Sequence, residues 1–397
     1  MGLIITAKEA ANSLAITAPP ADKNVMRYIH QDPHWPKFSW DEGELLPVLA
    51  AVRHKQGHLL GRMEGLGFRF RAEASLNNLT ADVIKSSAIE GSNLPADQVR
   101  SSIARRLGLD FGGDTPASHD VEGVVEMMVD ATQNFAAPLT ADRLCGWQAA
   151  LFPAGRSGIR RVLVGKWRTA ELDPMHVVSG PISRDRIHRK NIHFEAPAAD
   201  RLPREVAAFL KWFECRDGVD PVLRAGVAHL WFVTIHPFED GNGRVSRAIA
   251  DMALARAEAS TARFYSLSTQ IEADKKAYYL TLEKTQKGGM DITGWLKWFL
   301  ECMDRAIQGA ETSLAVVLRK SVTWERINGQ FQVNDRQRTV VNQLLDGAEP
   351  ELSTSRYAKL AKCSLDTALR DIKDLVDAGI MLRSTSGGRS TKYSLAP

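Results

Sequence analysis

The stretch IHPFEDGNGRVSR, residues 235–247, decides more about the fold and chemistry of this chain than any other segment of its length. Gly241 and Gly243 leave room for backbone N–H groups to converge on an anion, because neither carries a Cβ atom. The apolar residues that follow predict a helix, whose positive N-terminus faces the same point. Arg244 and Arg247 lie three residues apart and can point from one face of that helix. The stretch therefore predicts a turn between two helices that binds phosphate.

Further side chains in this stretch add chemistry to a phosphate site. Asp240 is placed to hold a divalent cation that bridges phosphate groups. Asn242 can donate to a phosphate oxygen, and His236 is a base suited to neutral pH. Glu239 is expected to face solvent. Each residue alone is commonplace, and the lysine of a P-loop and the third glycine of a dinucleotide fold are missing. Together they indicate nucleotide-dependent group transfer.

The composition is that of an ordinary folded protein with two or three domains. The chain has 397 residues, of which 44% are hydrophobic and 25% charged. Its net charge of +4 is too small to make nucleic acid or membrane the main partner of the whole chain. The four cysteines form no C-x-x-C pair, which argues against a zinc or disulfide framework. We expect a cytoplasmic protein, because neither a signal peptide nor a membrane-spanning stretch is found.

Hydrophobic periodicity predicts helices along most of the chain, and hence a mainly α fold. After a capped helix near residue 41, the predicted helices cover residues 72–89, 95–108, 119–136, 140–152, 203–216, 221–235, 243–258, 271–287, 291–308, 336–346, 353–361 and 364–378. Residues 157–196 lack this period and are rich in β-branched and turn residues. They predict a hairpin or flap followed by a loop.

The string from His236 to Arg244, with Arg247 three residues further on, resembles the signature of Fic-domain proteins at every defining position. The flanking segments AHLWFVTIHPF and KKAYYLTLEKTQKGGMDITGWLKWFL resemble helices of the same all-helical core. Members of this family mostly transfer AMP from ATP to a protein hydroxyl. The resemblance implies that His236 is the base toward a Tyr, Thr or Ser hydroxyl and that Asp240 binds Mg²⁺. The phosphate-binding residues that it implies are Gly241, Asn242, Gly243, Arg244 and Arg247.

The resemblance extends to residues outside the motif. Tyr279 and Gln286 match positions that border the adenine in relatives. Segment 166–196 resembles the flap that docks an extended target segment by strand pairing. The docking residues that this implies are Val177, Val178 and Ser179. Relatives that act as kinases carry a lysine at the position of Gly243, so we expect AMP transfer here. The implied partner is a protein hydroxyl, on another protein or on the chain itself.

A second motif, SSAIEGSN at residues 86–93, matches the inhibitory pattern of the family. Its matching residues are Ser86, Glu90 and Gly91, in a helix over about 74–91. The resemblance implies that Glu90 pairs with Arg247 and blocks productive ATP binding. Taken alone, the motif is merely a helix C-terminus with Gly91 as its cap. In some relatives this glutamate instead orients a water and the enzyme removes AMP, so that direction of reaction stays an alternative.

Residues 334–397 resemble a winged helix, with Thr367 and Arg370 exposed on its recognition helix. The predicted wing carries Gly387, Gly388, Arg389 and Lys392 near its tip. DNA is therefore a candidate partner, and docking of a protein or formation of a homodimer is the alternative. Four aspartates on the helix weaken a face that grips phosphate: Asp366, Asp371, Asp374 and Asp377. A DNA-binding regulator with the Fic core as its sensor is thus a further hypothesis.

These segments predict the domain organisation. Residues 26–70 resemble a small N-terminal domain of unknown function that accompanies Fic cores. We expect a helical N-terminal domain over 1–115, including the inhibitory helix, and a Fic core over 116–312. A linker helix over 313–333 and the winged helix over 334–397 complete the prediction.

Overall fold

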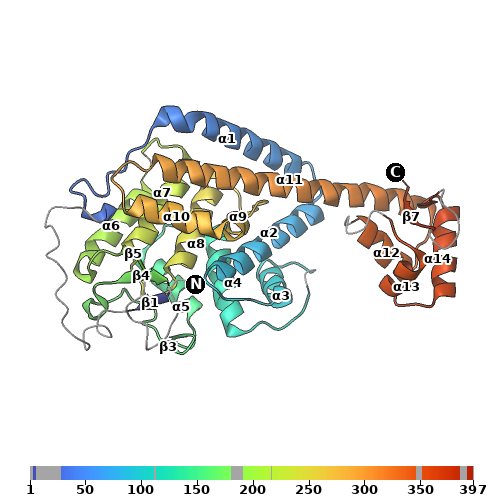
Figure 1. The fold of residues 1–397 in the computed structure, drawn as a ribbon, viewed down its shortest axis with the longest axis horizontal. Coiled ribbons are helices and arrows are strands. Elements are labelled where there is room, and N and C mark those ends of the chain that lie inside the picture. The colour runs from blue at the N-terminus through green and yellow to red at the C-terminus, as the bar shows by residue number, and fades with distance from the viewer. Residues whose placement is uncertain are drawn as a thin grey trace. The chain divides into compact units, whose positions relative to one another are not determined.

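The computed structural model describes residues 3–5, 28–110, 113–179, 191–215, 217–345, 351–384 and 391–396. The chain divides into two compact units, Met1–Gln308 and Gly309–Pro397, which are described separately (Figure 1). Helices dominate both units and the strands form only small sheets, so the predicted mainly α fold class is confirmed. Most of the N-terminal segment and three wing-tip residues lie outside the described residues: Gly387, Gly388 and Arg389.

Two buried helices, α7 (Pro221–Ile235) and α8 (Asn242–Glu258), form the centre of the first unit. They pack against each other, and both helices are buried on nearly every face; α7 is apolar, whereas α8 also buries polar side chains. The helices around them are α1 (Glu42–Glu64), α2 (Phe68–Ile89), α3 (Ala96–Arg106), α4 (His119–Gln133), α5 (Ala141–Leu151), α6 (Leu202–Glu214), α9 (Leu267–Ala273), α10 (Lys275–Gln286) and the first part of α11 (Thr293–Gln330). This packing fixes both ends of the loop between α7 and α8.

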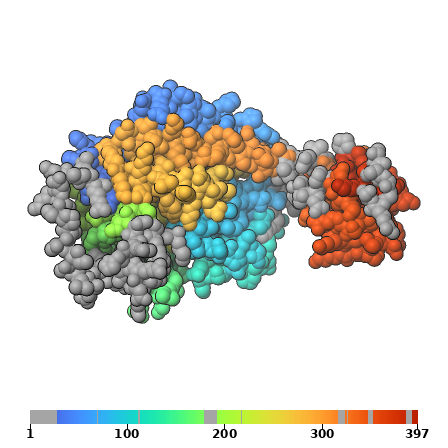
Figure 2. All heavy atoms as spheres, viewed as in Figure 1, coloured from blue at the N-terminus to red at the C-terminus, as the bar shows by residue number. Residues whose placement is uncertain are grey.

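Two ion pairs connect α1 to α11. Lys55 Nζ lies 2.7 Å from Asp304 Oδ1, and Lys297 Nζ lies 2.8 Å from Glu44 Oε1. Figure 2 shows side chains of α1 and α11 together on one face of the first unit. None of the helices in the described part of the chain is both long enough and apolar enough to cross a membrane.

Two predicted helix boundaries differ from the structure. The helix predicted over 271–287 is two helices, α9 and α10, because the backbone turns at Asp274 and Ser266 caps an earlier start. The helix predicted over 291–308 continues to Gln330, through most of the segment predicted as a separate linker helix. A lone glycine such as Gly309 costs about 1 kcal/mol within a helix, which neighbouring residues outweigh.

The strands of the first unit form a hairpin and a small sheet. Residues 157–196, predicted as a hairpin or flap followed by a loop, supply most of these strands, but the sheet also includes residues 3–5, which were not predicted as a strand. The hairpin pairs β2 (Arg156–Ser157) with β3 (Arg160–Arg161). In the sheet, β4 (His176–Ser179) lies between β1 (Leu3–Ile5) and β5 (Asn191–Glu195), antiparallel to both. Strand β5 contacts α10, which brings the sheet beside the α7–α8 loop (Figure 1).

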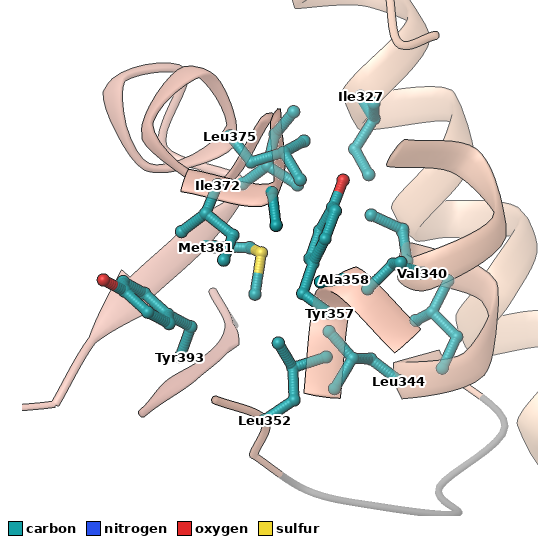
Figure 3. Packing of buried hydrophobic residues seen from close by; sticks show 14 residues of the cluster. Ile327, Val340, Leu344, Leu352, Tyr357, Ala358, Ile372, Leu375, Met381 and Tyr393 are labelled. Atoms are coloured by element: carbon teal, nitrogen blue, oxygen red, sulfur yellow. The ribbon is translucent and has the colours of Figure 1, made fainter. Parts of the chain in front are cut away.

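In the second unit, α12 (Asp335–Leu345), α13 (Thr354–Leu360) and α14 (Leu365–Asp377) precede the hairpin of β6 (Met381–Arg383) and β7 (Tyr393–Leu395). All three helices agree with the predicted ranges to within one or two residues. Their apolar side chains meet in one core, where Ile327, Tyr357 and Leu375 point toward one another (Figure 3).

The placement of two α14 side chains corrects the sequence prediction. Asp371 does not add negative charge to the exposed face of α14, because it is buried and accepts hydrogen bonds from Arg336 Nε and Nη2 at 2.9 and 3.0 Å. Thr367 is only half exposed, and its hydroxyl shares a hydrogen bond with Ser364, the N-cap residue of the helix. Arg370 is exposed, as predicted.

Candidate active site

The loop between α7 and α8 is held in one conformation from both sides. His236 caps α7 with a left-handed backbone (φ 50°, ψ 57°), and Gly241 begins α8 at φ 90°. Phe238, between them, is fully buried against Trp167 and Phe232. A left-handed conformation is uncommon for a residue other than glycine, so the surrounding contacts must stabilise His236.

Two loop residues predicted to bind phosphate make hydrogen bonds within the loop. Asn242 Oδ1 accepts from the Phe238 N–H at 3.0 Å, and Asn242 Nδ2 donates to the Phe238 carbonyl at 2.8 Å. The Gly241 N–H donates to Asp240 Oδ1 at 2.6 Å. The side chain of Asn242 therefore stabilises the loop conformation. The backbone N–H groups of Asn242, Gly243 and Arg244 remain, because the first turn of a helix has no internal acceptors for them.

Both acidic residues of the loop have a defined place. Glu239 does not simply face solvent: its Oε2 accepts from the Leu163 N–H at 3.1 Å. Asp240 lines a cavity. The Gly241 N–H donates to its Oδ1, and its Oδ2 takes no part in that hydrogen bond. No group of three or more His, Cys, Asp or Glu side chains that could hold a metal gathers anywhere in the described ranges. A cation on Asp240 would therefore complete its coordination with phosphate oxygens and water, which is how Mg²⁺ is commonly bound.

His236 lines the same cavity, and one of its ring nitrogens is unprotonated. Its Nδ1 lies 3.3 Å from the Val233 carbonyl, which can only accept, so Nδ1 carries the proton. Nε2 is buried and has no hydrogen-bond partner among the residues that the structure describes. Burial, followed by the positive charge of Arg168, lowers the pKa of His236 to about 4. The imidazole is therefore neutral at physiological pH and ready to accept a proton.

The two arginines of the motif are buried on α8 and differ in their partners. Arg247 donates from Nε to Ser86 Oγ at 2.8 Å, and from Nη2 to the Ser86 carbonyl at 2.9 Å and to Glu90 Oε1 at 2.8 Å. The guanidinium of Arg244 lies over the ring of Phe152, 5.0 Å from its centre. Arg244 Nε and Arg247 Nη1 are buried without an acceptor in the described part of the chain. Donors of this kind can bind an anion or a water molecule.

Glu90 lies where an anion would be expected, at the N-terminus of α8. A Cβ atom added to Gly243 would lie 2.1 Å from Glu90 Oε1, so only glycine admits this carboxylate. Burial raises the pKa of Glu90, but the charges of Arg247 and Arg244 outweigh it and hold the pKa below its ordinary value. Gly91 ends α2 with φ 85°, as its predicted capping role requires. The predicted contact between Glu90 and Arg247 is thus present in the structure.

Polar residues every four positions along α2 form one stripe that faces the core. They are Asn78, Asp82, Ser86 and Glu90. Asn78 donates to the Tyr265 carbonyl at 2.9 Å, and Asp82 accepts from Ser266 Oγ at 2.5 Å. Only the last two members of the stripe were predicted as functional. The fourfold spacing was the sequence signal that could have found the others.

Asp82 predicts a pH-dependent stability. Burial and the nearby Asp251 raise its pKa to about 7. The folded protein thus binds a proton that the unfolded chain releases, and the free energy of unfolding falls as pH rises from about 4 to 7. Because one pKa unit corresponds to about 1.4 kcal/mol, we expect Asp82→Asn to stabilise the first unit at pH 8 by roughly 2–4 kcal/mol and hardly at pH 4. Urea denaturation followed by tryptophan fluorescence measures the free energy of unfolding at both pH values.

The exposed Asp97 on α3 provides the control for that experiment. Asp97→Asn should leave the difference between the two pH values as in the unchanged protein. A pH dependence that survives Asp82→Asn would show that Asp82 is not the titrating group.

One cavity of about 350 Å³ brings most of the predicted site residues together. Its lining includes His236, Asp240, Gly241, Asn242 and Gly243 of the loop, Glu90 of α2, Val177 and Val178 of β4, and Tyr279 and Gln286 of α10. Gln286 donates from Nε2 to Thr234 Oγ1 at 3.1 Å. Ser86, Gly91, Arg244 and Arg247 lie outside this lining. Ser179 ends β4, and its side chain is outside the described part of the structure.

The cavity also has residues that the sequence did not single out. His193 Nδ1 of β5 lies 2.6 Å from Glu283 Oε2 of α10, and both residues line the cavity. The wall that α10 provides also includes Lys276, Tyr278, Leu280 and Leu282. No motif marks these residues, because a strand and a helix that are distant in sequence bring them together.

The helical core, its loop and its cavity agree with the comparisons to known proteins. Residues 138–254 match the Fic/DOC family, and residues 28–109 match a domain of unknown function, DUF4172. The protein adenylyltransferase Fic of Nematostella vectensis is 30% identical over 122 residues, which are 30% of this chain and 27% of that protein. The protein adenylyltransferase fic-1 of Caenorhabditis briggsae is 25% identical over 133 residues, which are 32% of this chain and 25% of that protein. This chain is a Fic-domain protein.

The matches to relatives and solved structures differ in extent. The chain spans about a quarter of the length of the curated relatives it matches. A Fic family protein from Desulfovibrio desulfuricans G20 aligns with a TM-score of 0.48 and 20% identity, over 91% of this chain and 98% of that chain. Fic-1 from C. elegans (residues 134–508) aligns with a TM-score of 0.44 and 18% identity, over 69% of this chain and 76% of that chain.

Proposed function

We propose that this chain is an autoinhibited protein adenylyltransferase, which transfers AMP from ATP to a Tyr, Thr or Ser hydroxyl of a protein. The observation that best supports this function is the buried, unprotonated Nε2 of His236 at a cavity beside the N-terminus of α8. A base and an anion site facing one cavity are what transfer of a nucleotidyl group to a hydroxyl requires. The names of the relatives point to the same reaction.

The residues of the site divide the reaction between them. His236 Nε2 takes the proton of the target hydroxyl, whose oxygen forms a bond to the α-phosphorus of ATP. The bond from that phosphorus to the pyrophosphate breaks, and pyrophosphate leaves with the electron pair. Backbone N–H groups at the start of α8 stabilise the negative charge that develops, and Arg244 and Arg247 hold the leaving group. Mg²⁺ held by Asp240 supplies further positive charge when it is bound.

The contacts of α2 support the proposed inhibition. Three hydrogen bonds hold Arg247 to Ser86 and Glu90, so this cation is not free to receive a phosphate. The Glu90 carboxylate also lies against Gly243 at the start of α8. Glu90 therefore competes with ATP twice, for a guanidinium and for a helix N-terminus. ATP would bind productively only after the C-terminal end of α2 moves.

Mass spectrometry of the Glu90→Gly variant after incubation with ATP and Mg²⁺ tests the proposed function. We expect AMP on the variant itself or on proteins of an added lysate, and none when His236 is also replaced by alanine. Absence of any AMP adduct would count against transfer. The alternative reaction, removal of AMP, is tested on a protein that already carries AMP. Release of AMP by the unchanged chain, lost in Glu90→Gly, would favour it.

The partners of the chain remain proposals. We infer that β4, whose Val177 and Val178 line the cavity, docks the target segment. In the structure β4 already pairs with residues 3–5 of the same chain on the side away from β5. A target that adds a strand there would replace that pairing.

DNA binding by the second unit remains a prediction, as does dimerisation. Arg370 and Lys373 are exposed on α14, but so are Leu365 and Leu369, which suit a protein partner better than phosphate. Gel shifts against DNA at two salt concentrations test the prediction. Binding by basic side chains weakens steeply as salt increases, and absent or salt-insensitive binding would leave dimerisation, measured by light scattering, as the role to examine.

A further inference from the structure

Arg168, which the proposed reaction does not use, is buried beside the catalytic loop. Its side chain has no exposed surface, so each of its donors needs an acceptor inside the protein. Nε donates to the His236 carbonyl at 2.9 Å, Nη1 to Asp173 Oδ1 at 2.7 Å, and Nη2 to the Pro197 carbonyl. The Arg168 backbone N–H donates to the Pro237 carbonyl at 2.9 Å. One residue thus binds two consecutive carbonyls of the motif.

These hydrogen bonds hold the loop at His236, where the backbone conformation is strained. His236 is left-handed, a backbone conformation that is strained for a residue with a Cβ atom. It also follows the last turn of α7, where backbone carbonyls have no partner within the helix. The bond from Arg168 to the His236 carbonyl fixes the rotation of the peptide group that follows His236. The orientation of the imidazole depends on that backbone.

Asp173 holds the guanidinium in place from the other side. Its Oδ1 accepts from Arg168, and its Oδ2 accepts from the Ala199 N–H at 2.7 Å. The segment before β4 and the segment after β5 are therefore joined at this carboxylate. Arg168 is fixed by groups that lie outside the cavity, and Arg168 itself is not part of the cavity lining.

The charge of Arg168 also affects the state of the base. After burial, it is the largest influence that lowers the pKa of His236. The Val233 carbonyl, the Asp240 carboxylate of the loop and the Glu90 carboxylate of α2 act in the opposite direction. His193 of β5 and Lys276 of α10 line the same cavity. Removing the Arg168 charge leaves burial alone to oppose these three acceptors, so the imidazole should take up a proton at higher pH than in the unchanged chain.

We propose that Arg168 is a positioning residue for the base: its guanidinium, held by Asp173 and the Pro197 carbonyl, fixes the backbone at His236, and its charge disfavours a second positive charge on the imidazole. This inference rests on the proposed function, because it assigns His236 as the base. Arg168 touches neither the cavity nor the reacting atoms.

Kinetics of Arg168→Met and Arg168→Lys, each combined with Glu90→Gly, test the proposal. We expect Arg168→Met to lower kcat by about 10- to 100-fold, since small displacements of a catalytic group have effects of that order, with KM for ATP changed less than about twofold. The acidic limb of its pH–rate profile should move to higher pH. Arg168→Lys keeps the charge without the fork of donors, so its acidic limb should stay near that of the parent while kcat recovers only in part.

NMR titration of the His236 ring provides a readout that needs no transfer activity. We expect the ring to protonate at higher pH in Arg168→Met than in the unchanged chain, with Arg168→Lys close to the latter. If Glu90→Gly transfers no AMP, the proposed function fails, and the titration still decides the role of Arg168. An unmoved titration together with an unchanged kcat would overturn the inference. If Arg168→Met does not fold, Arg168→Lys with a kcat equal to the parent's would overturn it equally.

Discussion

Replacing Glu90 by glycine should raise the rate of AMP transfer at low ATP concentration by about 10- to 100-fold. The change removes a charge-assisted hydrogen bond of 2.8 Å to Arg247 and takes the carboxylate away from Gly243. Hydrogen bonds to charged groups contribute about 1.5–3 kcal/mol, which corresponds to this range of rates when the bond competes with ATP. The guanidinium of Arg247 then keeps its hydrogen bonds to Ser86 but loses the carboxylate, and it can turn toward a phosphate.

Two further variants distinguish the proposed inhibition by Glu90 from a general effect on α2. Glu73 is exposed on the same helix, so Glu73→Gly introduces the same flexible residue without touching the site. Glu90→Gln keeps the size of the side chain but removes its charge, and we expect an intermediate rate. Incorporation of label from α-phosphate-labelled ATP measures all three. Equal labelling of Glu90→Gly and the unchanged chain would refute the proposed inhibition by Glu90.

The motif loop could be predicted well because its information is local. Gly241 and His236 take left-handed conformations next to buried helices, and the spacing of apolar residues in α7 and α8 is visible in the sequence. The pairing of Glu90 with Arg247 could be predicted only through the family resemblance. The two residues lie on different helices, and no periodicity connects them.

Other assignments depended on contacts that a sequence does not display. The amide of Asn242 suits a phosphate and a backbone loop equally well, and the structure shows it bonded to Phe238. Arg168 lies in the segment predicted as the flap, but its role could not be predicted, since its contact to the His236 carbonyl joins segments 68 positions apart. The continuity of α11 was missed: one helix was predicted to end at residue 308 and a separate linker helix to cover 313–333, whereas α11 continues to Gln330. Tertiary packing overrides a single weak helix former such as Gly309.

Replacing His236 by alanine in the Glu90→Gly background should lower AMP transfer by about 100- to 10,000-fold, the usual contribution of a positioned general base. The Nε2 atom is buried, lacks a hydrogen-bond partner among the described residues, and belongs to a ring whose pKa is lowered to about 4 by burial and Arg168. The parent should therefore keep its full rate down to about pH 5 and lose it below, as the base takes up a proton.

Binding of ATP separates this loss of chemistry from a loss of the site. Alanine at position 236 leaves Arg244, Gly243 and Asp240 in place, so the affinity for ATP with Mg²⁺, measured calorimetrically, should change little. His34, whose side chain is 76% exposed, provides the matched histidine for a His34→Ala control. If His236→Ala loses less than about tenfold, the proton must go elsewhere. The candidate would then be the pair of His193 and Glu283, which lines the same cavity.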